Sequence, residues 1–276
     1  MTEENTRKTE GQKPAKRDKG RLFLIPSPLG DTAPEEVIPQ GTLALLPAIH
    51  KYVVEELRTA RRYLSAAGLK GQIDGIEMYE LNEHSTQEDA IRLLSLFDEG
   101  NDVGLISEAG LPAVADPGAS LVALCHTHGI EVVPKTGPSS LMMALMASGL
   151  NGQSFAFCGY LPSKSGERCQ AIRSIEKESK AMLRTMLFIE TPYRNDTMLE
   201  DILGTCSEDT LLCIAANITA EDEYISTRTI AEWISEKDFR IGKRPCVFAL
   251  YAGHSSNTAS GSRQSHSSKK SRHTGR

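Results

Sequence analysis

The stretch from residue 103 to residue 118, VGLISEAGLPAVADPG, restricts the possible folds of this chain more than any other. Val103, Leu105 and Ile106 form a short apolar run typical of a buried strand. The residues from Ser107 to Gly110 are small or polar and favour a turn. Asp116 then suits the N-cap of a helix and Pro117 its first position. A strand that leads through a turn into a helix is the building unit of an α/β protein.

A second unit of this kind follows directly. Residues 130–133 form another strand-like run, and PKTGPSS at 134–140 resembles another turn and helix start. Small residues at both strand exits predict a binding site at the carboxyl ends of the strands in an α/β sheet. The other strands that we expect lie at 21–25, 51–55, 77–81, 155–159, 186–189, 211–215 and 244–251.

Between residues 85 and 100 the pattern predicts a helix. Ser85 and Glu88 have the spacing of a capping box. Ile91, Leu94 and Phe97 recur at helical spacing, so we expect them to form its buried face.

The length of the chain sets the expected number of domains. A chain of 276 residues, of which 39% are hydrophobic, can form one large or two medium domains. We place the boundary near residues 134–137, which predicts an N-terminal α/β domain at 21–134 and a C-terminal α/β domain at 135–253. The ends, 1–20 and 254–276, are polar and lack apolar periodicity, so they are predicted to be disordered.

Composition argues against several classes of protein. The net charge of −5 gives no overall basic field that would favour nucleic acid. The six cysteines form no CxxC pair, which argues against a zinc or redox motif and suits a reducing compartment. No apolar run reaches the roughly 18 residues of a membrane span, and the first residues lack the apolar core of a signal peptide. We therefore expect a cytoplasmic protein with no membrane segment and no metal site.

Six segments carry a resemblance to a known family. They are LFLIPSPLGD, VVEELRTAR, LISEAGLPAVADPG, VVPKTGPSSLMMALMASGL, FCGYLPSKSGER and LFIETPYR, and they span residues 22 to about 200. Together they resemble the tetrapyrrole methylase superfamily of S-adenosylmethionine-dependent methyltransferases, and most closely its 16S ribosomal RNA 2′-O-ribose methyltransferase I family. The resemblance implies two α/β domains with the cofactor cleft between them, a homodimer, and 2′-O-methylation of a ribose in small-subunit ribosomal RNA.

The resemblance also indicates site residues. Methyl transfer by in-line displacement needs no metal, and the protein contributes mainly by aligning donor and acceptor. For S-adenosyl-L-methionine binding we assign Pro26, Glu108, Gly110, Leu111, Pro112, Ser139 and Ser140. A ribose hydroxyl must also lose its proton, so polar groups at strand exits become catalytic candidates: Glu56, Arg58 and Glu190. Lys164, Arg168 and Arg194 are candidates for contact with an anionic substrate.

Two other functions stay open at this stage. Glu221, Asp222 and Glu223 are acidic where the resembling family is basic, which favours a small-molecule acceptor such as a tetrapyrrole. Glu108 and Leu111 replace the family's usual residues, which leaves open a cofactor-binding module that has lost catalysis.

Overall fold

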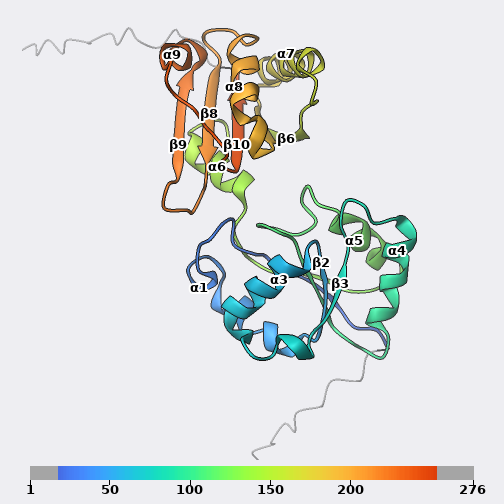
Figure 1. Cartoon of the computed structure of the whole chain (residues 1–276). Coiled ribbons are helices and arrows are strands. Elements are labelled where there is room, and N and C mark those ends of the chain that lie inside the picture. The colour runs from blue at the N-terminus through green and yellow to red at the C-terminus, as the bar shows by residue number, and fades with distance from the viewer. Residues whose placement is uncertain (1–17, 254–276) are drawn as a thin grey trace, which may run out of the picture.

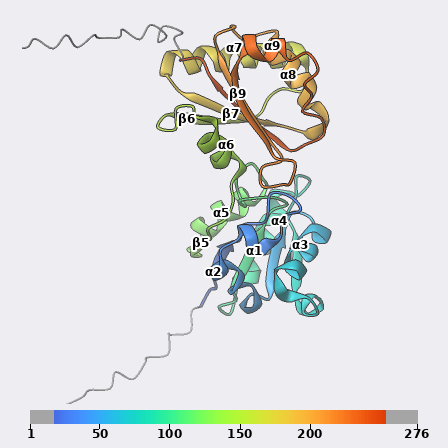
Figure 2. The ribbon, with the colours of Figure 1, turned by 90° about the vertical axis from the view of Figure 1, so that its left-hand side faces the viewer.

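The computed structural model describes residues 18–253, which form two β-sheets in chain order with helices packed on them (Figure 1). The strands of the first sheet lie between residues 22 and 134, and those of the second between residues 155 and 251. The turned view shows the two parts one above the other, with α6 (Ser140–Ser148) between them (Figure 2). The predicted α/β class is therefore confirmed, and the predicted boundary at 134–137 lies just before α6.

The first sheet is wholly parallel, with the strand order β3-β2-β4-β1-β5. Its strands are β1 (Leu22–Leu24), β2 (Lys51–Val54), β3 (Glu77–Glu80), β4 (Val103–Ile106) and β5 (Val132–Pro134). Every residue of the central strand β4 is buried. At Gly104 an added Cβ would lie 2.6 Å from ring atoms of Tyr52, so the packing of the sheet requires glycine there.

Helices connect these strands in the order expected for parallel pairs. They are α1 (Pro34–Val37), α2 (Gln40–Leu43), α3 (Leu57–Leu64), α4 (Gln87–Arg92) and α5 (Gly118–Thr127). Two apolar clusters form the core of this half, one around Phe23, Tyr52 and Leu64 and the other around Leu105, Phe97 and Leu121.

The second sheet is mixed, with the order β6-β7-β10-β8-β9. Its strands are β6 (Phe155–Tyr160), β7 (Thr185–Glu190), β8 (Leu211–Ala216), β9 (Tyr224–Thr229) and β10 (Cys246–Tyr251). Strands β6 and β7 run parallel, whereas β10 is antiparallel to both β7 and β8. The covering helices are α7 (Ser165–Met182), α8 (Asn195–Leu203) and α9 (Ile230–Ser235) on one side, and α6, whose Ala144 and Leu145 join the core of the sheet's other side.

Several local predictions need correction. The capping box of α4 uses Thr86 and Asp89 in place of Ser85 and Glu88: the Asp89 N–H donates to Thr86 Oγ1 at 3.2 Å, and the Thr86 N–H donates to Asp89 Oδ2 at 2.9 Å. The buried face also differs from the prediction: Ala90, Leu93 and Phe97 pack in the core, whereas Ile91 is 47% exposed.

The ends of other elements also differ from expectation. Helix α5 begins at Gly118, and Asp116 Oδ1 accepts from the Gly118 N–H at 2.7 Å, so Asp116 still satisfies a free amide at the helix start. Strand β9 and helix α9 were not predicted. Of the predicted N-terminal tail, residues 18–20 belong to the folded part, where the buried Gly20 donates its N–H to the Phe97 carbonyl at 2.8 Å. The rest of both predicted tails lies outside the described residues.

Within residues 18–253, no helix is both long and apolar enough to cross a membrane.

Candidate active site

Loops at the carboxyl ends of the first sheet face the second sheet across a cleft of about 650 Å³. The first sheet contributes the loops after β1, β2, β4 and β5, as expected for an α/β site. The second sheet contributes the ends of β6 and β7, the β8–β9 turn and the start of β10. The residues that line the cleft from the first part include Leu29, Glu55, Ser107, Glu108, Gly110, Leu111, Val114 and Asp116; those from the second include Ser139, Ser140, Leu141, Tyr160, Ile189, Glu190, Asn217, Asp222, Cys246 and Val247.

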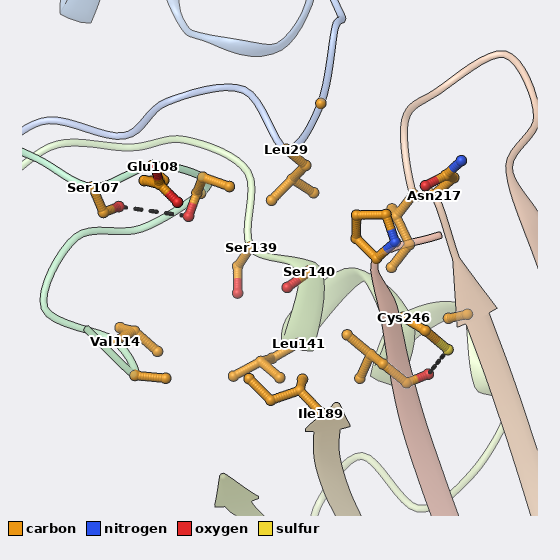
Figure 3. Close-up of a pocket in the computed structure, with 18 of the residues that line it drawn as sticks. Leu29, Ser107, Glu108, Val114, Ser139, Ser140, Leu141, Ile189, Asn217 and Cys246 are labelled. Carbon is orange, nitrogen blue, oxygen red and sulfur yellow. Dashed lines mark hydrogen bonds between the residues drawn. The ribbon is translucent and has the colours of Figure 1, made fainter. Parts of the chain in front are cut away.

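Hydrogen bonds to the loop after β1 hold the loop after β4 in place. Ser27 and Gly110 exchange backbone hydrogen bonds of 2.9 and 3.2 Å, and Ser27 Oγ donates to the Ser107 carbonyl at 3.2 Å. Gly110 has a φ of +75°, and a Cβ added there would lie 3.0 Å from Leu29. Figure 3 shows Leu29, Ser107 and Glu108 around this part of the cleft. Glycine therefore allows two loops to approach closely at the edge of the cleft.

The start of α6 forms the facing wall. Ser139 is its N-cap and accepts weakly from the Met142 N–H at 3.4 Å, and Ser140 is the first helical residue. Figure 3 shows both serines beside Leu141 and opposite the loop after β4. The loop before them is packed tightly, because a Cβ on Gly137 would lie 2.2 Å from the Cβ of Pro26.

The predicted cofactor residues therefore fall into two groups. Glu108, Gly110, Leu111, Ser139 and Ser140 line the cleft. Pro26 and Pro112 are buried outside its lining, and the Pro26 carbonyl accepts from the Tyr63 hydroxyl at 2.8 Å. Both prolines contribute to the packing of the loops beside the cleft, and their assignment to the cofactor stays a prediction.

Carboxyl groups make the first-sheet side of the cleft acidic. The Glu108 N–H donates to Glu55 Oε2 at 3.3 Å, and Asp116 accepts from the amides of Ala113 and Gly118. Burial raises the pKa of Glu55 above its usual value, and the nearby charges of Asp116 and Glu108 raise it further. Burial likewise raises the pKa of Asp116. A ligand with positive charge would relieve this repulsion.

Glu190, at the end of β7, is the most buried carboxylate of the cleft. Its side chain is 0% exposed. Its Oε1 accepts from the Thr191 N–H at 2.6 Å and from Arg194 Nε and Nη2 at 3.0 and 2.6 Å. Its Oε2 is buried and has no hydrogen-bond partner among the described residues. Such an atom is costly unless a ligand satisfies it.

Tyr160 lies close enough to both Glu190 and Glu55 for their charges to affect its hydroxyl group. Its pKa is raised by burial first, and then by the negative charges of Glu190 and Glu55. The cleft thus brings together the carboxyl group of Glu55 directly after β2, the phenol of Tyr160 from β6 and the carboxyl group of Glu190 from β7.

The predicted catalytic residue Glu56 lies elsewhere. Its carboxylate accepts from the backbone N–H groups of Arg58 and Thr59 at 2.9 and 2.6 Å, so it caps α3. These bonds lower its pKa. Glu56 does not line the cleft, whereas its neighbour Glu55, the first residue after β2, does. Arg58 is exposed and outside the cleft lining.

Arg168 is also wrongly predicted. It is 2% exposed, and its Nε lies 2.6 Å from Asp201 Oδ2 while Nη1 donates to the Ser163 carbonyl at 2.7 Å. A guanidinium held in this way inside the protein cannot reach a phosphate. Lys164 is exposed, lies outside the cleft lining and pairs with Glu167 at 3.5 Å. Arg194 stands beside the cleft through its pair with Glu190.

The acidic 221–223 segment belongs to the turn between β8 and β9, which forms another edge of the cleft. Asp222 accepts from Asn217 Nδ2 at 2.8 and 2.9 Å, and both side chains line the cleft. The Thr219 carbonyl accepts from Thr32 Oγ1 of the first part at 2.9 Å. No periodic pattern or motif marks Asn217. Tyr160 stands in the segment FCGYLPSKSGER, and Glu55 is the last residue of the predicted strand at 51–55, so these two could have been found.

In the described part of the chain, no group of three or more His, Cys, Asp or Glu side chains is arranged to hold a metal ion.

Comparison with solved structures identifies the fold. The chain matches a conserved hypothetical protein from Aeropyrum pernix K1 with a TM-score of 0.61 at 16% identity, covering 86% of each chain. It matches uroporphyrin-III C-methyltransferase from Thermus thermophilus, solved with S-adenyl homocysteine, with a TM-score of 0.53 at 18% identity, covering 84% of this chain and 97% of that one. These likenesses show the tetrapyrrole methylase fold.

Sequence comparison identifies the family. No family model matches the chain. It is 33% identical over 229 residues to ribosomal RNA small subunit methyltransferase I of Escherichia coli O157:H7, which covers 82% of this chain and 76% of that protein. The protein of the same name from Vibrio cholerae is 33% identical over 222 residues, covering 79% and 73%. The predictions of the fold and of an S-adenosylmethionine-dependent methyltransferase are confirmed, and the chain belongs to the ribosomal RNA small subunit methyltransferase I family.

Proposed function

We propose that this protein transfers a methyl group from S-adenosylmethionine to a ribose 2′-hydroxyl of small-subunit ribosomal RNA. Family membership supports the RNA substrate, and the buried, unpartnered Oε2 of Glu190 supports a hydroxyl acceptor. A substrate of this kind would place the protein in the cytoplasm.

The cleft fits the cofactor in size and chemistry. Its volume lies within the range of about 300–1,000 Å³ that small-ligand sites occupy. Apolar side chains such as Leu29, Leu141 and Val247 offer a surface for an adenine ring. The carboxyl groups of Glu55 and Asp116 would favour the positive charges of the sulfonium and amino groups. When bound, the cofactor supplies an electrophilic methyl group.

Glu190 is the proposed catalytic residue. The hydroxyl oxygen that gains the methyl group must lose its proton, and Oε2 of Glu190 is free to accept it. Arg194 holds the other carboxylate oxygen and so fixes the orientation of the group. Tyr160, near Glu190, is placed to hydrogen-bond to the acceptor ribose.

A labelling experiment tests this function. Radioactive S-adenosylmethionine is incubated with the protein, and label is counted in purified small ribosomal subunits and in a small-molecule fraction. We expect label in the ribosomal RNA, blocked by a 2′-deoxy residue at the modified position. Label in the small-molecule fraction alone would contradict the RNA substrate, and binding of cofactor without any transfer would contradict the enzymatic role.

The variant Glu190→Gln tests the proton acceptor. It keeps an oxygen for the Thr191 N–H but cannot take up a proton, so we expect methyl transfer to fall about 10²–10⁴-fold. Calorimetry should show unchanged affinity for S-adenosylhomocysteine. The matched control Glu56→Gln, at the cap of α3, should retain methyl transfer, and an active Glu190→Gln enzyme would exclude Glu190 as the base.

We further propose that the protein is a homodimer, as the family resemblance implies. The exposed Met142 and Met146 on α6, of which Met146 is 78% exposed, give apolar surface for a partner. Light scattering in solution measures the mass directly, and a monomer at micromolar concentration would contradict the proposal.

A further inference from the structure

Tyr193 is the most exposed large hydrophobic residue of the described chain, at 80%. It stands in a 3₁₀ turn (Pro192–Arg194) directly after β7, and the preceding Thr191 and Pro192 line the cleft. An aromatic ring so exposed contributes nothing to the core. Its position at the mouth of the cleft gives it access to whatever enters there.

A basic loop presents one cation, Lys243, to the same ring. The segment 240–244, RIGKR, precedes β10, and Pro245 and Cys246, which follow it, also line the cleft. Since Cys246 pairs with Glu190 across the two strands, this loop and the Tyr193 turn extend from neighbouring positions of the sheet. The Lys243 ammonium lies 5.1 Å from the centre of the Tyr193 ring, within the range of a cation–π contact.

The start of α8 fixes this arrangement. Asn195 Nδ2 donates to the carbonyls of Gly242 and Arg244 at 3.1 and 2.7 Å, and Asp196 Oδ1 accepts from the amides of Ile241 and Gly242 at 2.7 and 3.2 Å. Gly242 has a φ of +69°, which allows the tight turn. The two residues that follow Arg194 therefore hold the backbone of the loop that carries Lys243.

Charge is distributed unevenly around the mouth of the cleft. Lys243 is exposed beside Tyr193, and Arg240 is exposed at the start of the same loop, whereas Glu221, Asp222 and Glu223 lie at the β8–β9 turn. A polyanion is attracted to the first edge and repelled by the second. This distribution of charge favours entry of a polyanion into the cleft along the edge that carries Tyr193.

We propose that Tyr193, Lys243 and Arg240 form a stacking platform for single-stranded RNA: an unpaired base next to the target ribose stacks on the Tyr193 ring, and its flanking phosphates contact Lys243 and Arg240. Aromatic rings beside basic side chains are the means by which proteins hold unstacked RNA bases. This inference rests on the proposed function and adds to it the residues that receive the nucleotide chain.

Binding of a fluorescent single-stranded oligoribonucleotide, with the sequence around the modified ribose, tests the platform in the presence of S-adenosylhomocysteine. Tyr193→Ala should weaken binding roughly tenfold, the loss of one base–aromatic stack. Tyr193→Phe should bind as the wild type, because it keeps the ring. Lys243→Glu and Arg240→Glu should each make the slope of log K against log salt concentration less steep, by about the amount expected for the loss of one phosphate contact.

Lys70→Glu is the matched control, since exposed Lys70 precedes β3 at the edge of the first sheet away from the cleft. Every variant should bind S-adenosylhomocysteine with wild-type affinity. Unchanged RNA affinity in Tyr193→Ala, or an equal effect of Lys70→Glu and Lys243→Glu, would overturn the platform. A change of oligomeric state in Tyr193→Ala, with RNA affinity unaltered, would assign the ring to a protein interface. If the wild type labels no small-subunit RNA, the proposed function itself fails.

Discussion

At the residue scale, Gly110 is the position where the cleft tolerates least change. Its φ of +75° is costly for a residue with a Cβ, and the added atom would lie 3.0 Å from Leu29. We expect Gly110→Val to lose measurable S-adenosylhomocysteine binding in calorimetry while its circular dichroism spectrum stays that of the wild type. The matched variant Gly41→Val, in α2 where a Cβ meets nothing within 4 Å, should bind normally. Equal affinities would show that the loop after β4 does not contact the cofactor.

Glu55 carries a second prediction, on pH. Its pKa is raised in the folded protein, so the carboxylate destabilises the fold once the pH rises above the usual glutamate value of about 4.3. Glu55→Gln should therefore be more stable than the wild type at pH 7, and the difference should vanish below about pH 4. Urea titrations at both pH values measure this. The variant should also bind the positively charged S-adenosylmethionine more weakly at pH 7. If the wild type were more stable than the variant at pH 7, the pKa of Glu55 would not be raised in the folded protein.

At the scale of elements, the pair of Arg168 and Asp201 joins α7 to α8. Replacing Arg168 by Met would leave the Asp201 carboxylate, whose side chain is 15% exposed, without a cation and with only the Ser165 hydroxyl as a hydrogen-bond donor, so we expect a loss of about 3 kcal/mol in the free energy of unfolding. Lys164→Met removes an exposed ion pair one turn away and should change it by less than about 1 kcal/mol. Chemical denaturation gives both values, and a stable Arg168→Met protein would show that the pair is dispensable.

The elements that the sequence predicted are those with a strong apolar pattern. The buried run of β4 and the small residues around it marked the central strand and its loop correctly. Strand β9 was missed because YISTRT at 224–229 is polar and only half-buried, at the edge of its sheet. The capping box moved by one residue because Ser85 and Thr86 are both good caps, and only packing against the sheet decides between them.

The candidate site was predictable only where a loop has a recognisable sequence. Glu108, Gly110, Ser139 and Ser140 come from such loops and line the cleft. A sequence does not show whether a charged side chain points into a cleft, caps a helix or pairs inside the protein, so Glu55 was overlooked beside Glu56, and Arg168 was mistaken for a surface cation. Tyr193 and Lys243 are 50 residues apart, and only the register of β7 with β10 brings them together.

At the scale of the whole molecule, the cleft draws on both parts of the chain, so a ligand in it should stabilise both. Trp233, the only tryptophan, is buried in the second part and reports its unfolding. At 100 times its Kd, S-adenosylhomocysteine should add about 2.7 kcal/mol to the free energy of unfolding. The midpoint of the Trp233 fluorescence transition should rise although most loops that we assign to the cofactor belong to the first part. A constant Trp233 midpoint with a rising circular dichroism midpoint would mean that the ligand contacts the first part alone.

The separation of the two sheets has a consequence for the history of this fold. Most of the loops that we assign to the cofactor follow strands of the parallel sheet, while Glu190, Tyr193 and the 240–244 loop, which we assign to the acceptor, lie in or beside strands of the mixed sheet. Mutations that change the specificity for the methyl acceptor would therefore arise in a different part of the chain from mutations that weaken binding of the methyl donor. Such a division would let an enzyme of this fold acquire a new methyl acceptor by a few mutations, because the binding of the methyl donor depends on other residues and is retained.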